Sequence, residues 1–450
     1  MDWMIMLAQL LLSLSFLVAV HEMGHLLAAK YFGMRVEQFS IGFPPKIWSF
    51  KKGETEYALS AIPLGGYVKI SGMIDESLDT EAMKLPPQPW EFRAKPAWQR
   101  LIVMLGGIVV NVIIGVMIFI GITYVYGDSY ILKDVINENG GFHVGPAGEL
   151  IGLKTGDKIV KINGQDFEYY EDVYKPETLL STNGSYTVER DGKLIDISIP
   201  EDFIQRFNKK GSARTFLFPR LPTVVEEVSK EGNYIATRIL QPGDKILEVN
   251  GTPVQYKDEI ETAIAALKAD SASSKSDSIV LKISRAGNIL TFKEYFGDQK
   301  VIGVFFASKE FLKKAEKNIT YGFFESIPIG TEKAFTTLAV QVKALGRVVT
   351  GGLSPKESLS GPIGIMQLFG NVWDWSRFWS LTGVLSLVLA FMNLLPIPAL
   401  DGGHVMFLSY EIISRRKPSD KFLENAQKVG MLFLLVLMVF IFANDIIKLF

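Results

Sequence analysis

The sequence contains no cysteine, and this absence limits the chemistry that the chain can perform. Disulfide bonds and thiolate metal ligands are excluded, so any metal ion must be held by histidine or carboxylate side chains. Histidine is also scarce, with 4 residues among 450. The formal net charge is only −1, which gives no indication of a nucleic-acid partner. Hydrophobic residues, by contrast, make up 48% of the chain, a high share for a soluble protein.

Four apolar segments are long enough to cross a bilayer as helices, for which roughly 20 residues are needed. The first lacks a basic N-terminal region and a small-residue cleavage site, so we interpret it as a retained span and not as a secretory signal. The long middle of the chain has the composition of a soluble region. We therefore predict a polytopic α-helical membrane protein with four transmembrane helices, at approximately 3–30, 100–126, 378–401 and 428–447.

Basic residues indicate the orientation of these spans. The loop between the first two spans carries ten lysine and arginine residues, and the loop after the third span carries four. Basic loops of this kind stay in the cytoplasm. We therefore expect both termini and the soluble region to be extracytoplasmic. The first and third spans then run in the same direction, so their far ends reach the same depth.

A metal-binding motif lies near the end of the first span, where His21 and His25 flank Glu22 in the pattern His-Glu-x-x-His. Histidines at i and i+4 share one face of a helix, so one metal ion can contact both rings. Glu22 can take a proton from a metal-bound water. An ionisable group inside a membrane helix costs roughly 2.5–3.5 kcal/mol, which favours a functional site. The alternative is a helix end whose polar residues reach the lipid headgroups.

The far end of the third span offers a third ligand. Pro396 and Pro398 interrupt the helix there, since proline lacks an N–H group and clashes with the preceding turn. Asp401 follows and can complete a three-ligand zinc site with an open position. His404 is an alternative to Asp401 as the third metal ligand. If Asp401 is not a ligand, it can instead cap the N-terminus of a helix. The nearby Asn393 can bind a substrate carbonyl or satisfy the broken helix backbone.

Four stretches spread over the chain carry a family resemblance: VHEMGHLLAAKYFGMRVEQFSIGF from Val20, IPLGGYVKISG from Ile62, SGPIGI from Ser360 and NLLPIPALDGGH from Asn393. Together they resemble the site-2 protease family of intramembrane zinc metalloproteases, and most closely its bacterial regulator-of-sigma-E branch. The resemblance implies a Zn²⁺ cofactor held by His21, His25 and Asp401. It also implies Glu22 as the catalytic acid and base, and Asn393 in substrate binding.

The second span departs from the family pattern. Relatives often have Gly-Pro followed three residues later by Asn, whereas this chain has Gly106-Gly107 and then Asn111. The asparagine is kept and the proline is not. We retain Asn111 as a candidate substrate-binding residue.

Two extended segments, 56–62 and 67–71, flank Gly65 and Gly66. This pattern predicts a β-hairpin with a glycine-rich turn. Its edge could hold an unwound substrate by strand addition, so we include Gly65 and Gly66 among the candidate substrate-binding residues. The family resemblance implies that the hairpin is associated with the membrane. The alternative is a hairpin that only braces the first two helices.

The soluble region contains an internal repeat. The template Leu-x-x-Gly-Asp-Lys-Ile-x-x-x-Asn-Gly starts at Leu153 and returns at Leu240, 87 positions later. The repeat resembles two tandem PDZ domains of α+β type, which bind peptides or exclude bulky substrates by size. The second copy departs from the usual pattern at 232–236, so its groove can be altered or closed.

A connector follows the repeat. Apolar residues recur at helical spacing from Phe335 to Val349 and predict an amphipathic helix that packs on the membrane surface or on the PDZ pair. The predicted organisation is 1–127 (first two spans and hairpin), 128–205 and 215–308 (PDZ-like domains), 309–375 (connector) and 376–450 (last two spans).

These features predict a zinc endopeptidase of the bacterial inner membrane that acts in regulated intramembrane proteolysis. Its partners would be the lipid bilayer and a single-pass membrane substrate, either an anti-sigma factor or a signal-peptide remnant, and no nucleic acid. One alternative is a scaffold with a vestigial metal motif. Another is a metal transporter, although transporters tend to show inverted repeats of broken helices and only the third span here is broken.

Overall fold

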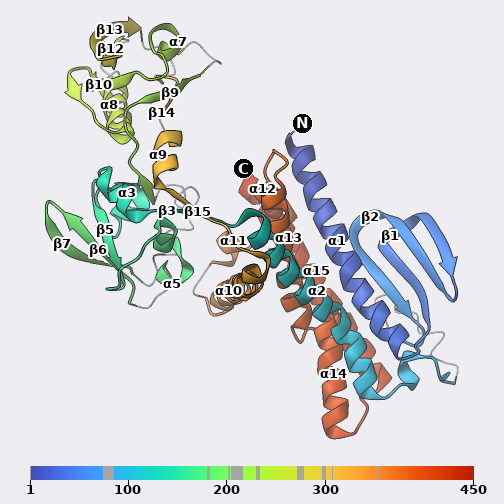
Figure 1. Cartoon of the computed structure of the whole chain (residues 1–450). Coiled ribbons are helices and arrows are strands. Elements are labelled where there is room, and N and C mark those ends of the chain that lie inside the picture. The colour runs from blue at the N-terminus through green and yellow to red at the C-terminus, as the bar shows by residue number, and fades with distance from the viewer. Residues whose placement is uncertain are drawn as a thin grey trace. The chain divides into compact units, whose positions relative to one another are not determined.

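The computed structural model describes residues 2–73, 86–179, 183–200, 203, 216–229, 234–270, 278–295, 301–306, 308–351 and 354–449. The chain forms two units (Figure 1). We call Met1–Gly127 with Thr320–Phe450 the helical unit, and Asp128–Ile319 the insert unit. The helical unit is thus built from both ends of the chain.

Four helices of the helical unit are long and apolar enough to cross a membrane, in agreement with the four predicted spans. The third is shorter than predicted, because its helix ends at Leu394 and not at Asp401. Pro396 and Pro398 prevent the helix from continuing, and a new helix begins at Asp401. The four spans lie in α1 (Asp2–Tyr31), α2 (Ala97–Tyr126), α13 (Trp375–Leu394) and α15 (Asp420–Leu449), and the new helix that begins at Asp401 is α14 (Asp401–Ser414).

Glycines bring α1 and α2 into backbone contact. A Cβ atom added to Gly106 would lie 2.6 Å from the carbonyl oxygen of Gly24, so neither position has room for a side chain. Small residues at such crossings are typical of helices that pack inside membranes. The crossing lies within one turn of His21 and His25, and therefore presses the metal motif against α2.

A β-sheet follows α1, formed by β1 (Val36–Lys52) and β2 (Thr55–Ile70). The predicted hairpin between 56–62 and 67–71 is wrong. Residues 38–41 pair with 66–69 on one side and with 56–59 on the other, so they separate the two segments. Among the described residues, 66–70 pair only with β1 and form an edge of the sheet.

The arrangement with residues 38–41 between the two segments is favoured because it supplies contacts that a direct hairpin lacks. The buried hydroxyls of Ser40 and Ser60 hydrogen-bond at 3.0 Å, and Val36 is fully buried under the sheet. Residues 63–66, predicted as a turn, belong to β2 itself. The side chains of Pro63 and Leu64 lie outside the described part.

The connector contains the predicted helix, α10 (Phe323–Val349), but its buried face is made of small residues. Ser326, Gly330 and Ala334 are buried, and a Cβ atom on Gly330 would lie 2.5 Å from Cα of Ile120 in α2. Phe335 is 49% exposed and Val349 is 79% exposed. The other short helices of this unit are η2 (Phe92–Ala94), α11 (Pro355–Ser358) and α12 (Pro362–Phe369).

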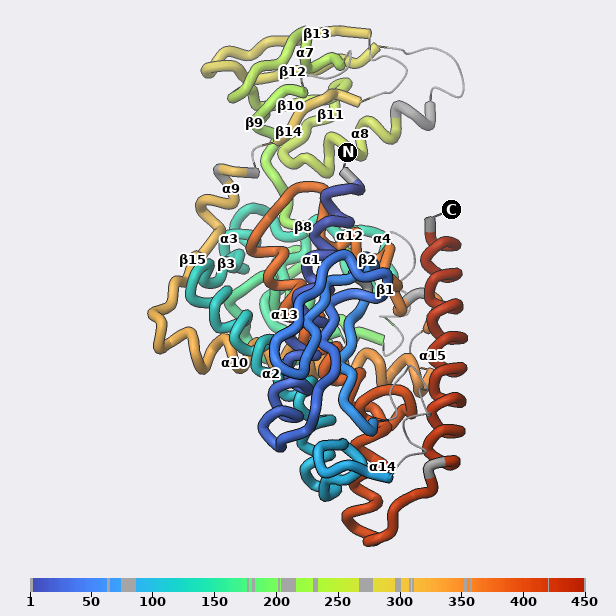
Figure 2. Tube along the Cα trace, turned by 90° about the vertical axis from the view of Figure 1, so that its right-hand side faces the viewer, coloured from blue at the N-terminus to red at the C-terminus, as the bar shows by residue number. Residues whose placement is uncertain are grey.

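The insert unit begins with β3 (Asp128–Ile131) and ends with β15 (Glu316–Ile319), and these two strands pair. Between them lie two lobes, each with its own buried core (Figure 1 and Figure 2). The first lobe contains α3 (Lys133–Glu138), β4 (Phe142–Val144), α4 (Pro146–Glu149), β5 (Lys158–Ile162), η3 (Tyr170–Tyr174), α5 (Pro176–Leu179), β6 (Ser185–Arg190), β7 (Lys193–Ser198) and β8 (Leu217–Pro219). The second contains β9 (Val225–Val228), α7 (Ile235–Ile239), β10 (Lys245–Val249), β11 (Thr252–Pro253), α8 (Lys257–Asp270), β12 (Ser278–Arg285), β13 (Asn288–Tyr295) and β14 (Val304–Phe306), and α9 (Ser308–Ala315) follows.

The repeated aspartate has the same surroundings in both lobes. Asp157 accepts hydrogen bonds from Arg190, with a Nε–Oδ1 distance of 2.7 Å, and Asp244 accepts from Arg285 at 2.8 Å. Burial alone would raise the pKa of Asp244, but the bonds from Arg285 and from the N–H of Gln241 hold it below the usual range. Some predicted positions lie outside the described residues. They are the boundary between the two PDZ-like domains, at 205 and 215, and positions 232 and 233 of the second copy.

Candidate metal centre

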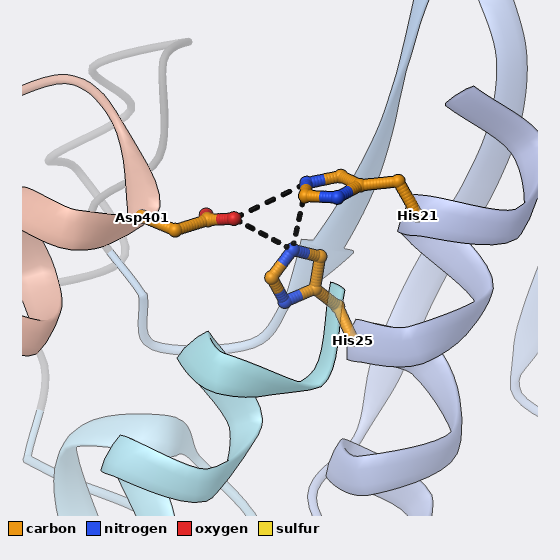
Figure 3. A group of neighbouring side chains, drawn as sticks. All are labelled: His21, His25 and Asp401. Carbon is orange, nitrogen blue, oxygen red and sulfur yellow. Dashed lines mark hydrogen bonds and ion pairs between the residues drawn. The ribbon is translucent and has the colours of Figure 1, made fainter. Parts of the chain in front are cut away.

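Three side chains from the two ends of the chain meet in the helical unit. His21 and His25 project from α1 toward Asp401, the first residue of α14 (Figure 3). The two Nε2 atoms lie 3.1 and 3.3 Å from Oδ2 of Asp401, and 3.3 Å from each other. Both histidines are buried, at 8% and 6% exposure. This triad is the group of potential metal ligands found within the described residues.

The atoms of the triad fit a small divalent cation. Oδ2 of Asp401 is buried and receives no hydrogen bond within the described structure, although two imidazole nitrogens face it. Converging acceptor atoms need protons or a cation between them. Tetrahedral zinc, with bonds of about 2.0–2.2 Å, holds neighbouring ligand atoms about 3.4 Å apart. The observed spacings are close to that value, and three ligands leave a fourth position open.

Helix α2 holds both imidazoles from behind. Nδ1 of His25 lies 2.8 Å from the carbonyl oxygen of Val103, and Nδ1 of His21 lies 3.1 Å from Nδ2 of Asn111. Gly107 lies between them, and a Cβ atom there would come within 2.5 Å of His25 Nε2 and 2.6 Å of His21 Cε1. Both Nε2 atoms face Asp401, and the absence of a side chain at Gly107 leaves room for the two rings against α2.

Glu22 lies between the triad and the sheet. The backbone N–H of Val68, on the β2 edge, is close enough to act on the Glu22 carboxylate. Gly66 allows this approach, because a Cβ atom at that position would lie 2.7 Å from a methyl group of Val18 and 3.4 Å from Cγ of Glu22. The structure thus places a carboxylate beside the triad and a partly buried strand edge beside that carboxylate.

A cavity of about 700 Å³ opens onto the triad. Its wall includes Asn393, whose Nδ2 lies 3.3 Å from Nε2 of His21, and His404, which does not join the three-residue cluster. Asn111 is not part of the wall. Gln38 and Gln427 also line the cavity, and no sequence signal distinguishes them from other surface glutamines. The remaining predicted residues on the wall are His21, Glu22, His25, Gly65, Gly66 and Asp401.

A helical unit of membrane-spanning length that brings two histidines, an aspartate and a free glutamate to one cavity defines a membrane metalloprotease. The family model for peptidase family M50 matches residues 9–437. The chain therefore belongs to peptidase family M50, which confirms the resemblance to the site-2 proteases.

Relatives align over nearly the whole chain. The regulator of sigma E protease of Haemophilus influenzae is 28% identical, with 100% of both chains covered. A provisionally named zinc metalloprotease of Treponema pallidum is 29% identical over 97% of this chain and 98% of that protein. A similarly named protein of Fusobacterium nucleatum is 29% identical over 97% of both chains. The names of these relatives agree with zinc as the metal.

Proposed function

We propose that the protein is a zinc-dependent intramembrane endopeptidase that cleaves a transmembrane segment of a single-pass membrane protein. The observation that carries this proposal is the convergence of His21, His25 and Asp401 beside Glu22, within a unit of four membrane-length helices. A scaffold has no need of the Glu22 carboxylate. A peptidase does need it, because hydrolysis requires a group that moves protons.

Bound zinc supplies Lewis-acid chemistry at the open position of the triad. The imidazoles of His21 and His25 and the carboxylate of Asp401 would hold the ion. Glu22 takes the proton of the attacking water and delivers it to the leaving amine. The Val68 N–H orients the Glu22 carboxylate for both transfers.

The β2 edge is the proposed site for the substrate chain. A helical peptide bond is shielded by its own hydrogen bonds, so the substrate must be extended before hydrolysis. Residues 66–70 form an edge of the sheet next to Glu22, with β1 as their strand partner in the described part of the chain, and this edge can add an extended segment. Gly66 keeps this edge close to α1, Gly65 leaves room for the ring of Phe43, and Asn393 can donate to a substrate carbonyl from the cavity wall.

The positive-inside pattern supports a metal centre near the cytoplasmic face of a bacterial inner membrane, with the insert unit outside. The relative named regulator of sigma E protease favours an anti-sigma factor as substrate over a signal-peptide remnant. Both classes present a membrane-spanning helix to the cavity.

The two lobes of the insert unit are proposed PDZ-like domains, and the first is better suited to exclusion than to peptide capture. The hydroxyls of Tyr170 and Tyr174 both donate to the carbonyl of Leu217 on β8. That carbonyl is therefore already satisfied and cannot pair with a peptide strand. This favours a role as a size filter, in which the lobe keeps substrates with large outer domains from the membrane.

The test is Glu22→Gln in the full chain, in detergent or vesicles, with a model transmembrane substrate. Glutamine keeps the shape but cannot move the proton, so we expect cleavage to fall by about 10³-fold or more while zinc content stays stoichiometric. Glu54→Gln, in the turn between β1 and β2, is the matched control and should cleave normally. Persistent cleavage by Glu22→Gln would reject the assignment of Glu22 as the group that moves the proton. Uptake of zinc across a vesicle wall would favour the transporter.

A further inference from the structure

We propose that Asn111 is a positioning residue whose carboxamide oxygen accepts a hydrogen bond from Nδ1–H of His21. This bond leaves Nε2 of His21 without a proton and aimed at the metal. The inference rests on the proposed function, since it concerns the same zinc centre. It gives α2 a defined task, which is to set the tautomers of both histidine ligands.

The position of Asn111 is well determined by its neighbours. The residue is fully buried, at 0% exposure, and its backbone carbonyl accepts a hydrogen bond of 2.7 Å from the Ser386 hydroxyl. Its carboxamide lies 3.1 Å from Nδ1 of His21. It lies behind the ring and outside the cavity wall. The geometry therefore favours contact with His21 over the predicted contact with substrate.

An imidazole binds a metal through one nitrogen only when the other carries the hydrogen. For His25 this is ensured by the Val103 carbonyl, because a backbone oxygen can only accept. His21 has no such backbone partner within the described residues. A carboxamide takes that place, and it can present either its oxygen or its nitrogen after a 180° rotation.

The two rotamers have opposite consequences. With Nδ2 toward the ring, His21 accepts at Nδ1 and must carry its hydrogen on Nε2, where it faces Asp401 and blocks a metal. In that rotamer Oδ1 of Asn111 is buried without a partner in the described structure. With Oδ1 toward the ring, this oxygen is satisfied and Nε2 is free for zinc. Zinc binding therefore selects the acceptor rotamer.

The experiment measures the zinc dissociation constant of the full chain in detergent by competition with a chelator. Asn111→Leu and Asn111→Ala remove the acceptor, and we expect zinc affinity to fall by about 10–100-fold in both. Asn111→Asp keeps an acceptor and cannot donate, so its affinity should stay within about threefold of the parent. Ser13→Ala removes a buried hydrogen bond between α1 and α13, away from His21, and should change nothing.

The aspartate variant separates positioning from general stability. If leucine and alanine weaken zinc binding and aspartate restores it, the acceptor role stands. If aspartate binds zinc as poorly as leucine, the nitrogen is the working group and the inference is wrong. Unchanged affinity in all three variants also overturns it. Two other results would instead reject the proposed metal centre itself. One is a parent chain without stoichiometric zinc, and the other is a His21→Ala variant that still binds zinc.

Discussion

Buried aspartates occur in both units, and their partners differ. Asp157 and Asp244 of the insert unit each face an arginine, which donates two hydrogen bonds to the carboxylate. Asp401 of the helical unit faces two imidazole nitrogens, and within the described residues no arginine, lysine or backbone N–H donates to its Oδ2. The first kind of site is complete as a protein structure. The second is complete only with a cation.

The comparison shows how a structural carboxylate can be told from a ligand. Both are buried and both have close nitrogen neighbours, so burial and distance do not separate them. The number of N–H donors that face the carboxylate separates the two kinds of site. A guanidinium brings several donors, whereas a neutral imidazole whose hydrogen is on Nδ1 brings none toward the carboxylate. Substitutions at the two kinds of site should therefore have different effects.

Asp401→Asn should have the largest effect. The amide keeps the size of the side chain but removes the anionic ligand, so we expect loss of zinc and a fall in cleavage of about 10³-fold or more. Asp157→Asn, at a carboxylate with its own arginine, should leave zinc content unchanged. Metal analysis of the purified full chain checks both variants. If His404→Gln lost zinc and Asp401→Asn retained it, the third ligand would be His404.

Gly107→Ala should have the next largest effect. The added methyl group comes within 2.8 Å of both imidazole rings, so α1 and α2 must separate and the ligands must move. A displacement of about 1 Å can cost 10²-fold in activity, and we expect kcat/KM to fall by about that factor. Gly121→Ala, on the same helix with nothing within 4 Å, is the matched control. Equal activity of the two variants would show that the contact at Gly107 is not limiting.

Arg285→Met should have the smallest effect, confined to the insert unit. Asp244 then loses its donors, and we expect the unfolding midpoint of that unit to fall by about 4–8 °C with zinc content unchanged. Because Arg285 holds the pKa of Asp244 low, its stabilisation is present above the unfolded pKa of about 3.9 and disappears as pH falls through the folded value. Calorimetry across pH 2–7 should show this acid step in the parent and a smaller one in the variant.

The sequence predicted the parts of the site that follow from local spacing. His21 and His25 are one turn apart on any helix, and Pro396 and Pro398 end the third span wherever it lies. The repeat around Asp157 and Asp244 was readable because both copies keep their turn residues. The ligand roles themselves remain proposals that the zinc measurements above address.

Contacts between segments that are distant in the sequence could not be predicted. No side chain marks the Val103 carbonyl as the partner of His25, and Asn111 carries no sign that it faces a ring and not a substrate. The order of strands in the sheet also failed, because adjacency in sequence favoured a hairpin while the buried contacts of Ser40 favoured an inserted strand. On α10 the apolar stripe was visible, but the close-packed face consists of Gly330 and its small neighbours.

The metal centre joins residues 21 and 25 to residue 401, and this has a consequence in time. Ribosomes add about 5–20 residues each second, so roughly 20–75 s separate synthesis of the two halves of the triad. During that interval the nascent protein already resides in the bilayer among other newly made membrane proteins. With the ligand set proposed above, it cannot hydrolyse any of them before α13 and the start of α14 have been synthesised.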